Sequence, residues 1–247
     1  MIELAKVITG WSHGGLRMRR AGDTRPVHGG FEFKSEFHEP GPKKVLGKTY
    51  KEDGVNEGLA ILADLARHPS TATYIATKLV RHFVADDPPT TAVKKIAAVF
   101  RTTDGDLAAV SAALVDLDEV WASPMPKVKN HYELVISALR VTGNVVADPR
   151  DIMQPLRELG RVPFTASSPK GWGDQAKDWI APEALMRRIE WLRRYSATLP
   201  STLFPAKLLE DTIGPVASDD TRTWVSRAPS GDAAIAMVLG SPEFQRR

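Results

Sequence analysis

Apolar and polar positions follow a helical period over most of this chain, most clearly between residues 58 and 84. Leucines recur at helical spacing in the first part of this stretch until His68-Pro69 interrupts the pattern. The residue before a proline is disfavoured in the α region, whereas proline itself fits the first turn of a helix. We therefore predict two helices that meet at Pro69.

The second of these helices has one apolar face. Apolar residues repeat there at intervals of three and four positions, which predicts that this face is buried. Its members are Ala72, Ile75, Ala76, Leu79 and Phe83. His82 falls at the border of the face and is expected at the edge of the core.

Similar periodicity, bounded by capping residues, glycines and prolines, predicts most of the later elements. The helix that begins at Pro182 is expected to carry an apolar face of Leu185, Met186, Ile189 and Leu192. The full set of helices is expected after Thr90, over 107–117, between Asn130 and Gly143, between Asp148 and Gly160, after Pro182, and around 205–213, 219–227 and 231–240, the last capped by Ser230 or Asp232.

Two segments rich in glycine, proline and aromatic residues interrupt the helices. In the first, a short β-hairpin with strands near 31–33 and 45–50 fits the local pattern. We predict a mainly α fold, a multi-helix orthogonal bundle within a single domain. Its parts are a Gly-rich basic loop region (10–58), a helical core (59–160), an aromatic loop (161–181) and C-terminal helices (182–247).

Composition limits the possible chemistry. The chain has 247 residues, of which 43% are hydrophobic and 26% charged, and it contains no cysteine. Disulfides, zinc–thiolate sites, iron–sulfur clusters and cysteine nucleophiles are therefore excluded. Because no apolar run approaches the roughly 18 residues needed to cross a bilayer, no membrane span is expected.

The positive charge is concentrated at the N-terminal end. Residues 1–51 hold 10 Lys+Arg and 5 Asp+Glu, and such an excess can attract an anionic partner. Some of these basic residues lie close to glycines, but none of these groups has the spacing of a phosphate-binding P-loop. A solvated basic loop is the favoured interpretation. No basic stripe interleaved with aromatic residues is present, so nucleic-acid binding is not expected. The candidate anion-binding residues are Arg17, Arg19, Arg20, Lys43 and Lys44.

Polar residues in the first third of the chain form a candidate cluster of His38, Glu39, His68 and His82. Histidine and carboxylate bind zinc or iron, but no pair has the spacing of a metal-binding motif. The favoured alternative makes His68 a helix-boundary residue and places His82 at the core edge. No metal and no cofactor are expected, and the chain has no G-x-S-x-G nucleophile motif.

The second loop segment carries the aromatic residues Phe164, Trp172 and Trp179. Exposed, they would stack on sugar rings or hold a partner protein; buried, they would seal the helical core. We favour burial and keep the three residues as a candidate interaction surface.

Seven short motifs along the chain, in order, resemble a known bacterial family. They are ITGW (8–11), FHEPGPKKVLGKTY (37–50), HPSTATYIATKLVRHFVADDPP (68–89), KVKN (127–130), SSPKGWGD (167–174), DWIAPEALMRRI (178–189) and SPEFQRR (241–247). This pattern is similar to domain-of-unknown-function family 1800. The resemblance implies that the chain is the C-terminal part of a longer, often exported protein. It also implies a sulfatase-like or phosphatase-like protein encoded nearby, and it provides no catalytic residue.

Two functions follow as expectations. The first is a non-catalytic helical scaffold or interaction protein of the bacterial envelope that acts with a partner. The alternative is a hydrolase-like enzyme, with or without a metal, that acts on an anionic or carbohydrate substrate at the histidine–glutamate cluster. A periplasmic or secreted location is expected if a missing N-terminal part carries a signal peptide, and a cytoplasmic location otherwise.

Overall fold

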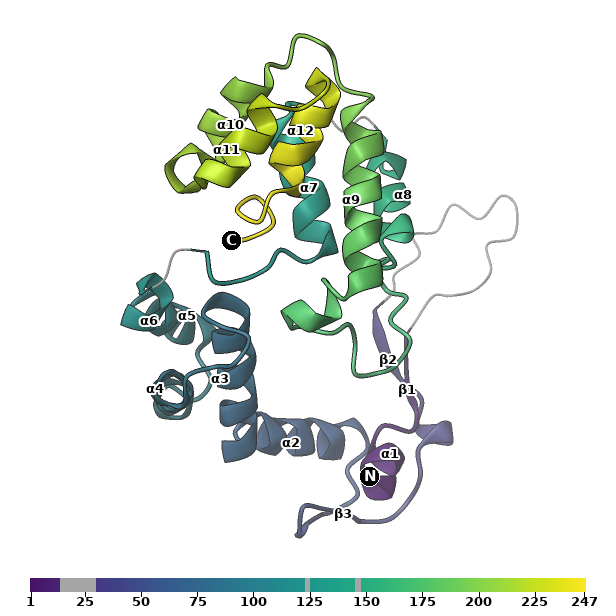
Figure 1. Ribbon diagram of the computed structural model, residues 1–247. Coiled ribbons are helices and arrows are strands. Elements are labelled where there is room, and N and C mark those ends of the chain that lie inside the picture. Colours follow the sequence, from purple (N-terminus) through teal and green to yellow (C-terminus); the bar gives the residue numbers. More distant parts are fainter. Residues whose placement is uncertain (14–29, 123–124, 145–147) are drawn as a thin grey trace, which may run out of the picture. The chain divides into compact units, whose positions relative to one another are not determined.

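The computed structural model of the chain describes residues 1–13, 30–122, 125–144 and 148–247 (Figure 1). Over these residues the fold is mainly α, as predicted. The α-helices are α1 (Ile2–Val7), α2 (Val55–Ala66), α3 (Pro69–Phe83), α4 (Thr90–Thr102), α5 (Leu107–Val115), α6 (Asp118–Trp121), α7 (His131–Val141), α8 (Arg150–Glu158), α9 (Pro182–Ser196), α10 (Pro205–Ile213), α11 (Asp219–Ser226) and α12 (Gly231–Gly240). The strands are β1 (Trp11–His13), β2 (Phe31–Phe33), β3 (Lys43–Val45) and β4 (Lys48–Tyr50), and the short 3-10 helices are η1 (Ser35–Phe37), η2 (Ala176–Asp178) and η3 (Gly214–Val216).

The chain forms two compact units. We call the first, Met1–Ile75 with Ala97–Leu107, the N-terminal unit, and the second, Ala76–Ile96 with Ala108–Arg247, the C-terminal unit. Helices α3 and α4 contribute residues to both units.

Two small antiparallel sheets belong to the N-terminal unit. Strand β1 pairs with β2, and β3 pairs with β4. The segments near 31–33 and 45–50 therefore form strands, but they do not pair with each other as expected. The hairpin closes instead through Leu46 and Gly47, whose φ angles of 48° and 85° suit the two-residue turns that match strand twist. Strand β2 is left to pair with the distant β1.

The core of the N-terminal unit is small and lies between α1, the β3–β4 hairpin and α2. Its buried residues are Val7, Tyr50 and Ile61. Beside it the indole ring of Trp11 lies directly on Gly58 of α2. A Cβ atom at Gly58 would lie 2.5 Å from this ring, so only glycine permits the contact.

The predicted helix break is confirmed, because α2 ends at Ala66 and α3 begins at Pro69. The buried face of α3 differs from the prediction. Ala72, Ala76 and Val80 are buried and Phe83 is 48% exposed. The buried stripe advances by four residues at each step, so it passes through Val80 and misses Phe83.

The C-terminal unit has the larger core, built from α7–α12. Helix α9 packs most extensively against α12, and α10 and α11 pack against α12 as well. The fully buried members of this core include Leu134, Val135, Leu192, Val238 and Leu239. Asn130 caps α7 with a capping box and Ser230 caps α12, and both match the caps that the sequence predicts.

Helix α9 turns a different face to this core from the predicted one. Leu192 is buried as expected, but Arg188 and Trp191 accompany it. Leu185, Met186 and Ile189 are 38%, 55% and 45% exposed. Periodicity alone does not predict the buried arginine, because its acceptors come from two distant segments.

Within the described ranges, none of the helices combines the length and the apolarity that a transmembrane segment requires.

Candidate functional site

A buried ion pair lies in the N-terminal unit between Lys43 of β3 and Glu57 in the first turn of α2. Lys43 Nζ is 3.0 Å from Glu57 Oε1, and the two side chains are 1% and 0% exposed. The second carboxylate oxygen, Oε2, is buried without a hydrogen-bond partner among the described residues. Because both charges are desolvated, each depends on the other for compensation.

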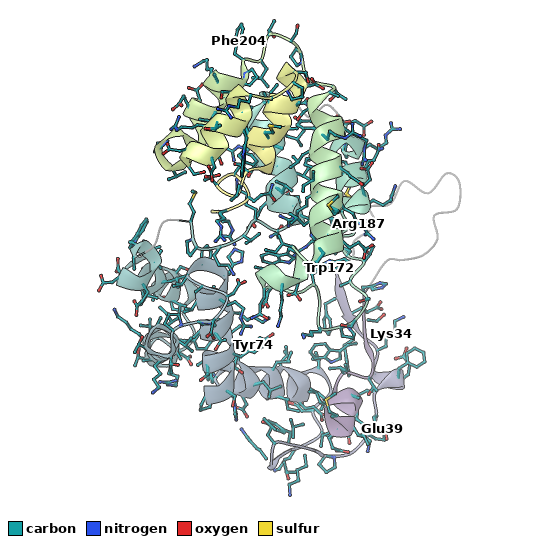
Figure 2. The ribbon with its side chains drawn as sticks, in the orientation of Figure 1. Lys34, Glu39, Tyr74, Trp172, Arg187 and Phe204 are labelled. Carbon is teal, nitrogen blue, oxygen red and sulfur yellow. The ribbon has the colours of Figure 1, made fainter. Side chains whose placement is uncertain are left out.

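His38 completes this buried network. Its Nδ1 lies 2.9 Å from the main-chain oxygen of Thr9, which only accepts, so Nδ1 carries the proton. Nε2 is then the acceptor for Lys43 Nζ at 3.2 Å. Glu39 contributes its main-chain oxygen, 2.5 Å from the same ammonium, while its side chain is exposed (Figure 2). The arrangement links the 38–43 segment to α2.

The other members of the predicted polar cluster lie elsewhere. His68 is exposed ahead of α3, and its Nδ1 accepts a hydrogen bond from the main-chain N–H of Ser70 at 3.1 Å. His82 belongs to the C-terminal unit, where its Nε2 is 3.3 Å from Arg247 Nη2. Partial burial, together with the charge of Arg247, lowers the pKa of His82. Among the described residues, no group of three or more His, Asp or Glu side chains is arranged to hold a metal ion.

The candidate anion-binding residues fall into two groups. Arg17, Arg19 and Arg20 lie outside the described residues. Lys43 is buried against Glu57, whereas Lys44, on the opposite face of β3, is exposed. An anion role for these residues stays a prediction.

The aromatic residues of the second loop segment differ in exposure. Phe164 is fully exposed and has a φ angle of 62°, and Trp172 is 36% exposed (Figure 2). Trp179 is only 4% exposed, and its Nε1 donates to the main-chain oxygen of Gly173 at 3.2 Å. Lys127 and Arg161 lie over its ring, 5.7 Å and 5.9 Å from the centroid. Trp179 therefore packs in the interior of the C-terminal unit.

Charged residues of the C-terminal unit join segments that are far apart in sequence. Asp86 forms an ion pair with the buried Lys127, and its second carboxylate oxygen accepts a hydrogen bond from the main-chain N–H of Ala176 at 2.6 Å. Lys78 pairs with Asp174 at 2.5 Å. These contacts connect the end of α3 with two of the motif segments that carry the family resemblance.

The last motif segment, 241–247, joins the same network. Arg247 Nε is 2.9 Å from Glu133 of α7, and its main chain pairs with that of Lys127. The guanidinium of Arg188 donates to the side-chain oxygen of Gln245 at 3.0 Å and to the main-chain oxygen of Lys129 at 2.8 Å. Short motifs that are separate in sequence thus form one charged interior.

A shallow apolar concavity of about 340 Å³, which we call the α9–α12 groove, opens on the surface of the C-terminal unit. Helix α12 provides small residues at its floor, and α9 and α11 provide larger ones. Trp224, Ile189 and Met237 are 56%, 45% and 39% exposed in it. Its lining residues are Ile189, Arg193, Trp224, Ala233, Ala236, Met237, Gly240, Ser241 and Pro242.

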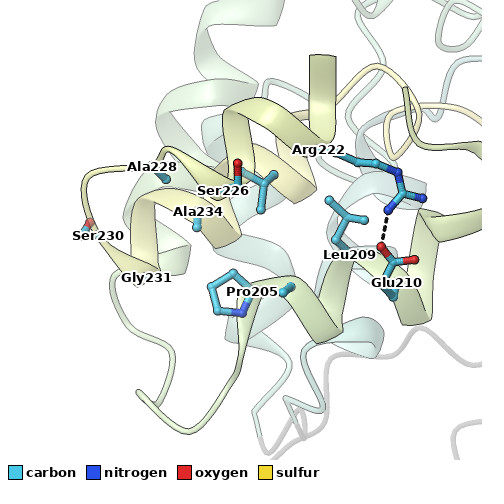
Figure 3. A pocket seen from close by; sticks show the side chains of 11 residues that line it. Pro205, Leu209, Glu210, Arg222, Ser226, Ala228, Ser230, Gly231 and Ala234 are labelled. Carbon is cyan, nitrogen blue, oxygen red and sulfur yellow. Dashed lines mark hydrogen bonds and ion pairs between the residues drawn. The ribbon is translucent and has the colours of Figure 1, made fainter. Parts of the chain in front are cut away.

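A second concavity of about 470 Å³ lies between α10, α11 and the start of α12 (Figure 3). Leu209, Val225 and Ala234 in its lining are buried apolar residues. At its edge Arg222 pairs with Glu210 and donates to the main-chain oxygen of Gly214 at 2.6 Å. These pairs already engage its charged groups, so this pocket offers a ligand mainly apolar contacts.

The sequence reasoning missed the α9–α12 groove. Ile189 gives a signal, since it belongs to an apolar stripe, but periodicity places that stripe in the core. Trp224 lies in a short helix, and the sequence prediction for 219–227 gives it no role at the surface. Recognising the groove from sequence requires knowing which face of α9 meets α12.

Comparison with protein-family models finds a match over nearly the whole chain. The model of the family described as "Protein of unknown function (DUF1800)" matches residues 1–246. No curated protein and no solved structure matches the chain.

Proposed function

This chain belongs to the DUF1800 family, and we propose that it is a non-catalytic helical interaction protein that binds a partner in the α9–α12 groove. The observation that supports this function is the exposure of three large apolar side chains around one concavity, Trp224, Ile189 and Met237. Contiguous apolar surface with a polar rim is typical of protein interaction sites, and tryptophan is enriched among the residues that contribute most to binding.

The shape of the groove favours a helix as the occupant. Ala233, Ala236 and Gly240 present almost no side chain along one face of α12, which lets another backbone approach closely. From residue 233 to residue 240 the floor is about 10 Å long, or two helical turns. An amphipathic helix would place apolar side chains at positions i, i+3 and i+7 against Trp224 and Ile189.

The charge at the rim adds a constraint on the partner. Arg193 lines the groove on α9, and no ion pair engages it in the part of the chain that the structure describes. A carboxylate on the partner helix would meet this guanidinium at the edge of the apolar contact, where such a pair contributes to orientation more than to affinity.

The location and the partner protein are part of the same proposal. The resemblance of the chain to an often exported family supports a role in the bacterial envelope. It also suggests the sulfatase-like or phosphatase-like protein encoded nearby as the partner. Cell fractionation of the producing bacterium tests the location, and a protein found only in the cytoplasm would contradict it.

Calorimetric titration of the purified chain with that neighbouring protein tests the groove. We expect Trp224→Ala to weaken binding by about 30-fold, because truncating a central aromatic anchor costs about 2 kcal/mol or more. Phe164→Ala is the matched control, since Phe164 is another exposed aromatic residue and lies outside the groove.

The two variants also separate the two candidate surfaces. If Phe164→Ala weakens binding and Trp224→Ala does not, the partner binds the aromatic loop and the groove proposal is wrong. A complex whose affinity neither variant changes would contradict both surfaces.

A further inference from the structure

Three cations of the C-terminal unit are at least partly buried and have no ion-pair partner among the described residues: Lys129, Arg161 and Arg188. Arg188 is completely buried. Its two terminal nitrogens donate to neutral oxygens, and its Nε has no hydrogen-bond partner. A buried guanidinium without a direct ion-pair partner is costly unless something compensates it.

His131, the first residue of α7, lies in the same region with unused polar atoms. It is 6% exposed, and both of its ring nitrogens are buried without a hydrogen-bond partner. A terminal nitrogen of Arg161 is also buried and unpaired, while the guanidinium of this residue lies over the ring of Trp179. Unsatisfied buried groups of this kind are rare in folded proteins and call for an explanation.

Contacts place these groups in one region of the unit, because Arg188 donates to the main-chain oxygen of Lys129, two residues before His131, and Arg161 lies over the same Trp179 ring as Lys127. Burial and the charges of Arg188 and Arg161 lower the pKa of His131 to about 4. Burial lowers the pKa of Lys129 to about 8 and that of Arg188 to about 10. Glu133 is the carboxylate that acts on Lys129, Arg161 and Arg188, but its own ion pair is with Arg247. The interior therefore holds an excess of positive charge.

We infer that Arg161, Arg188 and His131 form a binding site for a small oxyanion, a phosphate or a carboxylate. The unpaired guanidinium N–H groups are donors of the kind that bind the oxygens of such anions, and guanidinium hydrogen bonds to anions are about twice as strong as neutral ones. Neutral His131 supplies a further donor through one ring nitrogen. The negative charge of the ligand compensates Arg161 and Arg188, neither of which has an ion-pair partner among the described residues.

Such a ligand would join three separate segments of the C-terminal unit. His131 belongs to α7, Arg188 to α9 and Arg161 to the loop after α8. A ligand that binds only the folded state stabilises it by an amount that grows with the logarithm of the ligand concentration once that concentration exceeds Kd. The site is independent of the α9–α12 groove, since the two share no lining residue.

The experiment measures thermal unfolding and calorimetric binding of the whole chain in inorganic phosphate, in acetate and in chloride at equal ionic strength. We expect a saturable rise in melting temperature with phosphate or acetate beyond that with chloride, and the more effective anion identifies the ligand class. Arg161→Gln should weaken this binding by about tenfold or more, because a charged hydrogen bond is lost.

Arg157→Gln is the matched control. Arg157 is an exposed arginine on α8, for which the described part of the chain shows no ion pair, and its removal should leave anion binding unchanged. Arg161→Lys, which keeps the charge, should retain part of the affinity and show that loss in Arg161→Gln is not misfolding.

Two results would overturn the inference. One is equal stabilisation by all three anions, which is a general salt effect. The other is undiminished phosphate or acetate binding in Arg161→Gln, which would indicate an adventitious ion only.

Discussion

Removing one partner of the buried Lys43–Glu57 pair should destabilise the N-terminal unit strongly, whereas removing both should not. At the observed 3.0 Å, an effective dielectric constant of about 20 gives an attraction of about 5 kcal/mol. Desolvation of the two ions offsets much of this in the intact protein. In Glu57→Met the ammonium remains buried, with only His38 and the main-chain oxygen of Glu39 as acceptors. The expected loss is about 3–5 kcal/mol, a large part of the stability of an ordinary domain.

The double variant Lys43→Met/Glu57→Met replaces both charges by apolar side chains of similar length. It loses the hydrogen bonds from Lys43 to His38 and to Glu39, which together contribute about 1–2 kcal/mol. We therefore expect the double variant to be more stable than either single variant, and the cycle to show a coupling of about 3 kcal/mol or more.

Urea unfolding followed by circular dichroism measures these free energies, and hydrogen exchange of peptides from 41–61 assigns the change to the N-terminal unit. Lys48→Met is the matched control, because Lys48 pairs with Asp64 in the same unit and both side chains are largely exposed. This variant should change stability far less than Lys43→Met does. If the loss of unfolding free energy in the double variant equals the sum of the losses in the two single variants, the reasoning is refuted.

Three further predictions concern other parts of the fold. Folded His131 has a pKa of about 4 against an ordinary value of 6.5, so the unfolded chain binds more protons between these pH values and the free energy of unfolding should fall by about 3 kcal/mol as the pH drops from 6.5 to 4. Urea titrations at each pH measure this dependence, and His131→Phe should remove it. An unchanged pH dependence in His131→Phe would contradict the burial of the ring. Gly58→Ala should lower the melting temperature, because the new Cβ atom would lie 2.5 Å from the indole ring of Trp11. If that clash is the cause, the melting temperature of the Gly58→Ala/Trp11→Ala double variant should fall by less than the sum of the two single changes. Leu192→Ala should cost about 2–5 kcal/mol and Ile189→Ala under about 1 kcal/mol by chemical denaturation, and the reverse order would show that the predicted face of α9 was right after all.

The sequence predicted those features of the fold that depend on neighbouring residues. The helix break at Pro69 follows from local sterics, and the caps at Asn130 and Ser230 follow from side-chain oxygens that serve main-chain N–H groups nearby. Each of these features is decided within four residues along the chain. The pairing of β2 depends on distant residues instead, since its partner β1 lies about twenty residues away. The predicted partner of β2, the segment near 45–50, forms its own hairpin through the turn at Leu46-Gly47.

The candidate sites depend on distant contacts and were predicted only in part. His38 was selected as a polar residue with a functional environment, and it does enter a buried network. The sequence predicts its partner Lys43 only as a candidate anion-binding residue in a basic loop, and it gives its partner Glu57 no role in a site. Nothing in the local pattern separates a lysine that will be buried from one that stays in water, because burial depends on the carboxylate that α2 brings to it.

Helix α9 differs from its sequence prediction in two ways, because it buries an arginine and exposes apolar residues. Its buried arginine is stable inside because Lys129 and Gln245, 59 and 57 residues away, provide acceptors. Its exposed Met186 and Ile189 lie where a periodicity rule requires a core. A helix that served only as packing would not retain both features, since exchanging them would bury more apolar surface and hydrate the charge. Both features of α9 are explained by the two proposed sites. The buried cation is what an oxyanion site in the interior of the unit requires, and the exposed apolar residues are what a partner helix on its surface requires.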